Sequence, residues 1–208
     1  MCAVSTPPDH RAAPRYRDVV GVILAGGRST RYGRNKAFVR LHGVPLIERV
    51  IGVLRPLFPE ILLITNTPNE YAHLGLPMHR DLIPGLGPIG GIYTALSVLD
   101  REAGFFVACD MPRLNPKLIG YMVEARGDFD AVVPRIGGYM DALHALYTRA
   151  CLKPVRALID RRRYQVIRLY DRVSVRYVEE EEIRLLDPHL DSFLNINRPE
   201  ELERLKKP

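Results

Sequence analysis

The chain has 208 residues, of which 47% are hydrophobic, so it is long enough to bury the core of one globular domain. No stretch reaches the roughly 18 consecutive apolar residues of a membrane-spanning helix, and three cysteines without a C-x-x-C pair exclude a disulfide framework and a zinc site. The net charge of +6 favours an anionic partner. Because zinc-finger spacing, basic heptads and aromatic RNA-binding motifs are all missing, small phosphorylated substrates suit the chain better than nucleic acid.

The first 17 residues differ in composition from the rest. They are rich in Pro, Ala and Arg and lack the apolar centre of a secretory signal. We therefore expect residues 1–17 to form a flexible extension, residues 18–208 to form a single domain, and the protein to be cytoplasmic.

The next segment, residues 20–36, reads VGVILAGGRSTRYGRNK and carries the strongest signal in the chain. The strand Val19–Leu24 is Val/Ile-rich without alternation, which is typical of a parallel strand covered on both faces. Gly26 and Gly27 follow it, and a phosphate or a base can approach their backbone amides closely because glycine has no Cβ. The pattern predicts a strand that ends in a ligand-binding turn.

Two cationic side chains, Arg31 and Lys36, follow this turn at fixed distances and place positive charge where a polyphosphate would lie. The turn is not a P-loop, because Gly27 and Arg28 stand where Lys and Ser/Thr should be, and no G-x-G-x-x-G dinucleotide fingerprint follows the strand. The whole array predicts a different kind of nucleotide site.

Strands and helices alternate along most of the remaining chain, which favours a mostly parallel sheet with helices on both faces, an α/β fold in three layers. After the first strand, the expected strands are Glu60–Thr65, Gly104–Cys109, Phe129–Val133, Ala142–Tyr147, Val173–Val178 and Phe193–Ile196. The expected helices are Leu46–Leu54 with Pro45 at its first position, Ile92–Leu99, Pro116–Arg126, Leu152–Arg161 and Pro199–Lys206.

Polar residues gather where several of these strands end. In open α/β sheets ligands bind beyond the carboxyl ends of the strands, where we expect Thr65, Asn66, Asp81 and Asp110 beside the glycine turn. Asp110 directly follows a buried strand, and a carboxylate there suits Mg²⁺, which binds one or two carboxylates together with substrate phosphates. A helix cap is the alternative for Asp110.

The loop DLIPGLGPIGG, residues 81–91, holds four glycines and leads into a helix whose N-terminus favours anions. Four other features need interpretation, and three of them allow two alternatives. Arg161–Arg163 is either a solvated helix end or a patch for a phosphorylated second substrate or a partner protein. Glu179–Glu182 is interpreted as a solvated acidic face, His144 as a core residue or a ligand, and Asn195–Asn197 as a turn or a binding motif.

Taken together, six segments resemble the molybdenum cofactor guanylyltransferase family. They are LAGGRSTRYGRNK (24–36), LHGVPLIERV (41–50), DLIPGLGPIGGI (81–92), ACDMPRL (108–114), DALHALY (141–147) and NINRPEEL (195–202). The resemblance implies a three-layer α/β/α Rossmann-like nucleotidyltransferase fold with a mostly parallel central sheet. It also implies transfer of GMP from GTP to molybdenum-bearing molybdopterin, with release of pyrophosphate and formation of a guanine dinucleotide cofactor.

The resemblance, together with the chemistry of the residues themselves, assigns roles to individual positions. The nucleotide-binding positions are Leu24, Ala25, Gly26, Gly27, Lys36, Asp81 and Asp110, with a further contact at Thr65 or Asn66. Arg31, Lys36 and Asp110 are the expected catalytic residues, with Asp110 as the Mg²⁺ ligand. The acceptor side comprises Gly85, Gly87, Gly90, His144, Asn195 and Asn197. The substrates are GTP and molybdopterin, and molybdoenzymes or cofactor-delivery proteins are expected as transient partners, without nucleic acid or membrane.

Two other interpretations of the chain stay open at this point. A nucleotidyltransferase of the same fold could use CTP or a sugar-phosphate acceptor, and cytidylyltransferases with a similar first loop read A-A-G where this chain reads A-G-G. A non-catalytic homologue would bind nucleotide without turnover.

Overall fold

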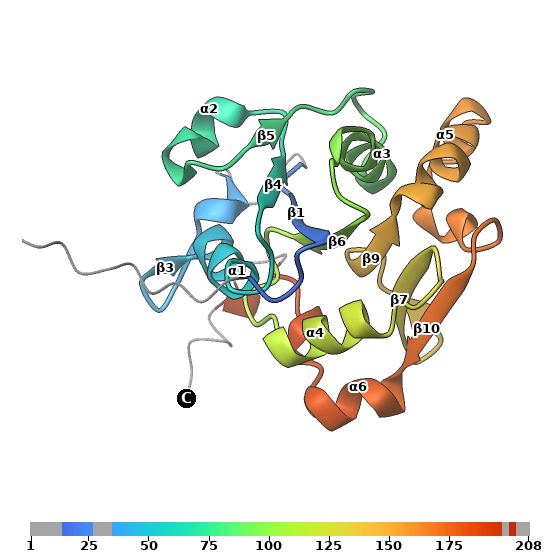
Figure 1. The fold of residues 1–208 in the computed structure, drawn as a ribbon. Coiled ribbons are helices and arrows are strands. Elements are labelled where there is room, and N and C mark those ends of the chain that lie inside the picture. Colours follow the sequence, from blue (N-terminus) through green and yellow to red (C-terminus); the bar gives the residue numbers. More distant parts are fainter. Residues whose placement is uncertain (1–13, 27–34, 197–199, 203–208) are drawn as a thin grey trace, which may run out of the picture.

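The computed structural model describes residues 14–26, 35–196 and 200–202 (Figure 1). Gly27, Arg31 and Asn197 lie outside these residues, as do most of the predicted extension 1–17 and most of the predicted C-terminal helix. Tyr16, two residues before the expected start of the domain, is buried and donates its backbone N–H to the Leu57 carbonyl at 2.9 Å.

An eight-stranded sheet forms the centre of the molecule, in the order β10-β7-β9-β6-β1-β4-β5 with β8 paired to β7. The strands are β1 (Val19–Leu24), β4 (Ile61–Ile64), β5 (Met78–His79), β6 (Ala103–Ala108), β7 (Ala131–Ile136), β8 (Tyr139–Met140), β9 (His144–Thr148) and β10 (Val175–Glu179). Within this sheet β8 and β9 run against the other strands. The predicted mostly parallel sheet is confirmed.

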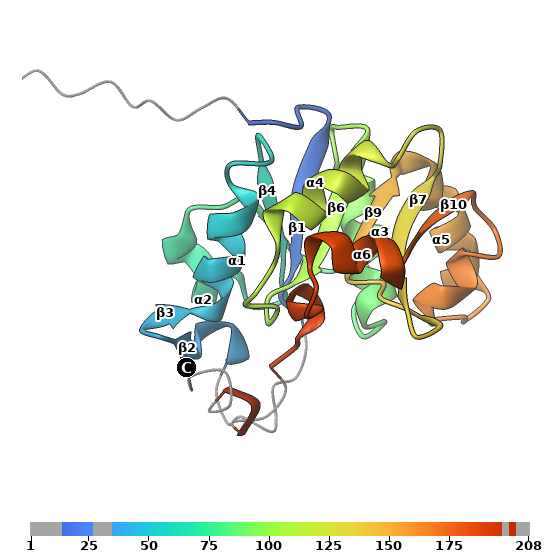
Figure 2. The same ribbon diagram turned by 90° about the horizontal axis from the view of Figure 1, so that it is seen from below.

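Helices cover both faces of the sheet and complete the three layers (Figures 1 and 2). On one face lie α1 (Leu46–Leu54), α4 (Pro116–Glu124) and α6 (Glu180–Leu186), and on the other α3 (Pro88–Val98) and α5 (Leu152–Asp160). A short helix, α2 (Pro68–Tyr71), and a hairpin of β2 (Arg40–Leu41) and β3 (Val44–Pro45) lie beside them. None of the helices in the described ranges is both long and apolar enough to cross a bilayer.

Several predicted boundaries change for identifiable reasons. Pro45 ends β3 and precedes α1 instead of opening it. The helix expected from Ile92 begins at Pro88, because proline is well suited to a first helical position.

The strand predicted over Phe193–Ile196 is wrong. Its first residue ends a 3-10 turn, Asp191–Phe193, in place of a strand. The Asp187 carboxylate accepts the backbone N–H groups of Asp191 at 3.0 Å and Ser192 at 2.8 Å. These local side-chain hydrogen bonds fix the chain in a turn.

The acidic run Glu179–Glu182 is also corrected, because it forms the start of α6 and is not merely solvated. Glu179 and Glu182 make a reciprocal capping box, with the Glu179 N–H 2.9 Å from the Glu182 carboxylate. Glu182 is ion-paired with Arg176, and Glu179 with Arg135. Negative charge in the first turn also suits the helix dipole.

The N-cap of α4 gives a first stability prediction. The Asn115 side chain accepts the Lys117 N–H at 2.9 Å and donates to the Leu186 carbonyl at 2.7 Å, which ties α4 to the end of α6. Asn115→Ala should cost about 1–2 kcal/mol of unfolding free energy in urea titrations. Asn69→Ala, at an exposed position of α2, is the control. Equal stability of both variants would contradict the capping role.

The Arg176–Glu182 pair gives a prediction about pH. The hydrogen bond from Arg176 lowers the pKa of Glu182 from 4.5 to about 2. The carboxylate therefore contributes stability above pH 4.5, and this contribution is lost as the pH falls toward 2. Glu182→Gln should be less stable than the parent at pH 7, and the difference should narrow below pH 4.5 in urea titrations.

Glu181→Gln, at an exposed neighbouring position, is the matched control for this titration. A Glu182→Gln deficit that stays constant from pH 7 to pH 3 would show that the carboxylate charge is not responsible.

Candidate functional site

The carboxyl ends of three parallel strands meet at one edge of the sheet. Leu24, the last residue of β1, is paired with Ile64 of β4 and with Ala108 of β6. The Ala25 N–H donates to the Ile64 carbonyl at 2.9 Å, and the Cys109 N–H donates to the Leu24 carbonyl at 3.2 Å. The residues that follow these strands therefore emerge side by side, as the sequence predicted.

Lys36 and Asp110 form an ion pair at this edge although 74 positions separate them in the sequence. Their side chains are only 14% and 17% exposed. The pair joins the end of the glycine-turn segment to the end of β6. At this edge the Lys36 ammonium group can bind a phosphate, and the Asp110 carboxylate can bind a metal ion.

The structure holds Lys36 in place through its neighbour Asn35. The Asn35 side chain caps the 3-10 turn Lys36–Phe38 by accepting the Ala37 N–H at 3.1 Å. Its amide also donates to the Tyr71 hydroxyl at 2.9 Å. The lysine is therefore anchored to α2 and starts from a defined backbone position.

Asn66 and Asp81 form a second polar pair at the same edge. The Asn66 amide donates to the Asp81 carboxylate at 2.7 Å, and its oxygen accepts the Asp81 N–H at 3.1 Å. Thr65 is 1% exposed and faces the core side of the strand end. Of the two alternatives for the further nucleotide contact, Asn66 is the exposed one, so its side chain is available beside Asp81.

The glycines of the site serve two different needs. Gly85 and Gly87 have φ values of +83° and +66°, which side chains rarely adopt, and shape the loop before α3. Gly90 and Gly91 lie inside α3, where a Cβ on Gly91 would come within 3.1 Å of the Leu24 side chain. A Cβ on Gly26 would meet no atom of the described residues within 4 Å, so none of them fills the space beside it.

Asp141 is a site residue that sequence reasoning did not single out. Burial raises the pKa of its carboxyl group, and the nearby charge of Asp110 raises it further. The carboxylate accepts the Leu143 N–H at 2.8 Å. Its position depends on β9 entering the sheet between β6 and β7, which the sequence does not reveal. The available signal was an acidic residue directly before an apolar run.

His144 follows three residues later in the chain, at the start of β9, and is fully buried. Its ring packs 5.4 Å from the Phe105 ring and 4.8 Å from the Phe193 ring, and neither ring nitrogen has a hydrogen-bond partner among the described residues. Burial lowers the pKa of His144 to about 3, so the ring is neutral. Asn195 is exposed, and the adjacent Ile196 N–H donates to the Asp110 carbonyl at 3.1 Å, which brings the C-terminal segment to the site.

The donor chemistry fits a hard cation that brings further ligands with it. Asp110 offers a partly exposed carboxylate, and Asp141 places a second carboxylate in its electrostatic range. Within the described ranges no group of three or more His, Cys, Asp or Glu side chains could enclose a metal ion. Mg²⁺ meets this arrangement well, since it keeps waters and takes substrate phosphate oxygens beside one or two carboxylates.

Comparisons with known proteins agree with this geometry. Residues 21–175 match the MobA-like NTP transferase domain. A probable molybdenum cofactor guanylyltransferase from Pelotomaculum thermopropionicum is 38% identical over 89% of this chain and 91% of its own length. The molybdenum cofactor guanylyltransferase from Desulfosudis oleivorans is 36% identical over 89% of this chain and 93% of its own.

A solved structure is similar as well. It is the molybdopterin-guanine dinucleotide biosynthesis protein A from Archaeoglobus fulgidus, with a TM-score of 0.77 and 28% identity over 90% of this chain and 96% of that one. The sequence match, the strand-end site and the fold lead to one conclusion: this chain belongs to the MobA-like nucleotidyltransferases, in the molybdenum cofactor guanylyltransferase family.

Proposed function

We propose that this chain transfers GMP from GTP to molybdenum-bearing molybdopterin, forming molybdopterin guanine dinucleotide and releasing pyrophosphate. The observation that carries the proposal is the Lys36–Asp110 ion pair beside the glycine turn, at the meeting point of β1, β4 and β6. Family membership supports the choice of substrates. The proposed catalytic domain comprises residues 18–208.

GTP would bind along the strand ends. The backbone of residues 24–27 would lie against the nucleotide, with the space beside Gly26 taking the larger purine. Asn66 and Asp81 already orient each other and would contact the nucleoside through their remaining donors and acceptors.

Of the described cations, Lys36 lies at the strand ends where the phosphates would bind. An incoming triphosphate would compete with Asp110 for its ammonium group, and Lys36 would then stabilise the charge that grows on the departing pyrophosphate. Arg31 is proposed to share this task.

Asp110 would hold Mg²⁺, with Asp141 as a second carboxylate within electrostatic range. When bound, the ion would neutralise and orient the α-phosphate that the terminal phosphate oxygen of molybdopterin attacks. The protein's part is to position the two reactants in line and to supply fixed charges, so no general base is assigned.

The acceptor would approach from the side of the C-terminal segment. The exposed loop with Gly85 and Gly87 and the segment with Asn195 and Asn197 would contact it, while Gly90 and His144 shape the surface from below. We expect the reaction to take place in the cytoplasm, where GTP is available, with transient contacts to molybdoenzymes or cofactor-delivery proteins.

The two members of the ion pair can be tested separately. Asp110→Asn and Lys36→Ala should each lower kcat for pyrophosphate release by about 10²–10³-fold, because each removes a fixed charge from the transferring phosphates. Lys153→Ala, at an exposed position of α5, is the lysine control and should retain activity. Thermal unfolding of all three variants separates a loss of charge from a loss of fold, and a fully active Asp110→Asn would refute the proposed site.

The choice of base can be tested at Gly26. A nucleotide panel with the molybdopterin acceptor should show turnover with GTP and little with CTP. Since the added Cβ meets no described atom, Gly26→Ala should fold normally while kcat/KM for GTP falls by about tenfold or more relative to CTP. A preference of the parent chain for CTP would favour the cytidylyltransferase alternative, and GTP binding without turnover would favour a non-catalytic homologue.

A further inference from the structure

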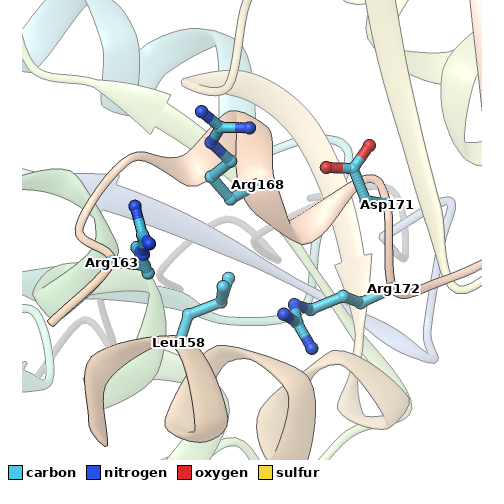
Figure 3. Close-up of a pocket in the computed structure, with 5 residues that line it drawn as sticks. All are labelled: Leu158, Arg163, Arg168, Asp171 and Arg172. Carbon is cyan, nitrogen blue, oxygen red and sulfur yellow. The ribbon is translucent and has the colours of Figure 1, made fainter. Parts of the chain in front are cut away.

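An arginine-lined cavity of about 550 Å³ lies between α5 and the 3-10 turn Val166–Leu169. Leu158 forms its floor, and Arg163, Arg168, Asp171 and Arg172 surround it (Figure 3). In this view the three arginine side chains of the arginine cavity, all from residues 163–172, stand around one open space.

The helix end shapes the cavity. The Arg163 N–H donates to the Leu158 carbonyl and the Arg162 N–H to the Ile159 carbonyl, each at 2.9 Å, which closes α5 in a Schellman motif. Arg162 takes the left-handed position with φ of +56°, where glycine is usual. This tight reversal turns the chain back so that Arg163 stands over Leu158.

The charges of the arginine cavity are not balanced by the protein. Three guanidinium groups face one carboxylate, and among the described residues the side chains of Arg163, Arg168 and Arg172 make no hydrogen bond or ion pair. Two helical arginines elsewhere behave differently: Arg156 of α5 pairs with Asp160 at 2.9 Å, and Arg184 of α6, on the other face of the sheet, pairs with Glu180 at 2.7 Å. Unpaired like charges around a hollow favour an anion inside it.

The arginine cavity is separate from the Lys36–Asp110 site. It lies at the β10 end of the sheet, whereas Asp110 follows β6. Strand β10 is the third strand from β6, so at about 4.8 Å between neighbouring strands these two strands are roughly 14 Å apart. In Figure 2, α5 lies at the opposite side of the sheet from the β2–β3 hairpin that follows Lys36.

The size and lining of the cavity indicate the kind of ligand. Small-molecule sites commonly measure about 300–1,000 Å³, and arginine forks match the oxygens of phosphate groups. An adjoining cavity of about 360 Å³ shares Arg168 and Asp171 and is lined by Met140, Tyr170 and Tyr177, among others. An anionic end and an apolar or aromatic body would both find partners here.

We propose that the arginine cavity is a second anion-binding site, which takes the phosphate group of a small organic phosphate. This site is additional to the transfer reaction, since the contacts proposed above for GTP and for molybdopterin do not involve Arg163, Arg168 or Arg172. The ligand binds through charge-assisted hydrogen bonds from these arginines, with Leu158 closing the floor.

Calorimetric titration of the full chain with inorganic pyrophosphate tests this proposal. Lys36→Ala serves as the background, because it weakens binding at the first site while the arginine cavity stays intact. In this background we expect one pyrophosphate-binding event, at the arginine cavity. Adding Arg168→Ala and Arg172→Ala should weaken it by about tenfold or more, since two charged donors are lost. The titration needs no turnover, so its outcome is independent of the proposed transfer.

A charge-matched control separates the site from general electrostatics. Arg55→Ala with Arg149→Ala, both exposed and outside the cavity, removes the same two charges and should leave pyrophosphate affinity unchanged. An equal loss in both double variants, or no binding in the Lys36→Ala background, would overturn the proposal. So would tight binding of a single-stranded oligonucleotide that only the cavity variant abolishes, because that result would assign the arginines to a macromolecule.

Discussion

The parallel pairing of β1 with β4 on one side and β6 on the other is the constraint on which the site depends. Leu24 is in register with Ile64 and Ala108, so three loops start from the same level of the sheet. The Lys36–Asp110 ion pair is the chemical result. Neither charge would be tolerated at this low exposure without the other, and the fold supplies both at one point.

The other half of the sheet is organised by β9. This strand runs against its neighbours and enters between β6 and β7, so the chain leaves it at the edge opposite the nucleotide site. Helix α5 then runs back across the face and ends at the arginine cavity. The same insertion sets Asp141, at the entrance of β9, close enough to Asp110 for their charges to interact. One topological feature thus positions both the second carboxylate and the second anion site.

Local patterns in the sequence predict the nucleotide half well. The strand Val19–Leu24 has the predicted bounds because it is an uninterrupted apolar run. The helix Leu46–Leu54 has the predicted bounds because a proline stands on each side of its helical pattern. Several short elements were missed, and a hairpin and a helix show why. The β2–β3 hairpin turns through His42 and Gly43, both with positive φ, and histidine is not the usual first residue of such a turn. Helix α6 was missed because its first turn is an acidic run that resembles a solvated surface. The capping glutamates of this run pair with Arg135 of β7 and Arg176 of β10, which are distant or unremarkable in the sequence.

The packing of Gly91 against Leu24 has a further consequence. The first turn of α3 and the tip of β1 touch through a glycine with no spare room, so the loop of residues 81–87 and the glycine turn share one rigid foundation. A displacement of either loop at its base must therefore be passed to the other. The donor nucleotide and the acceptor would then be aligned by a common mechanical support, and not by two independently adjustable arms.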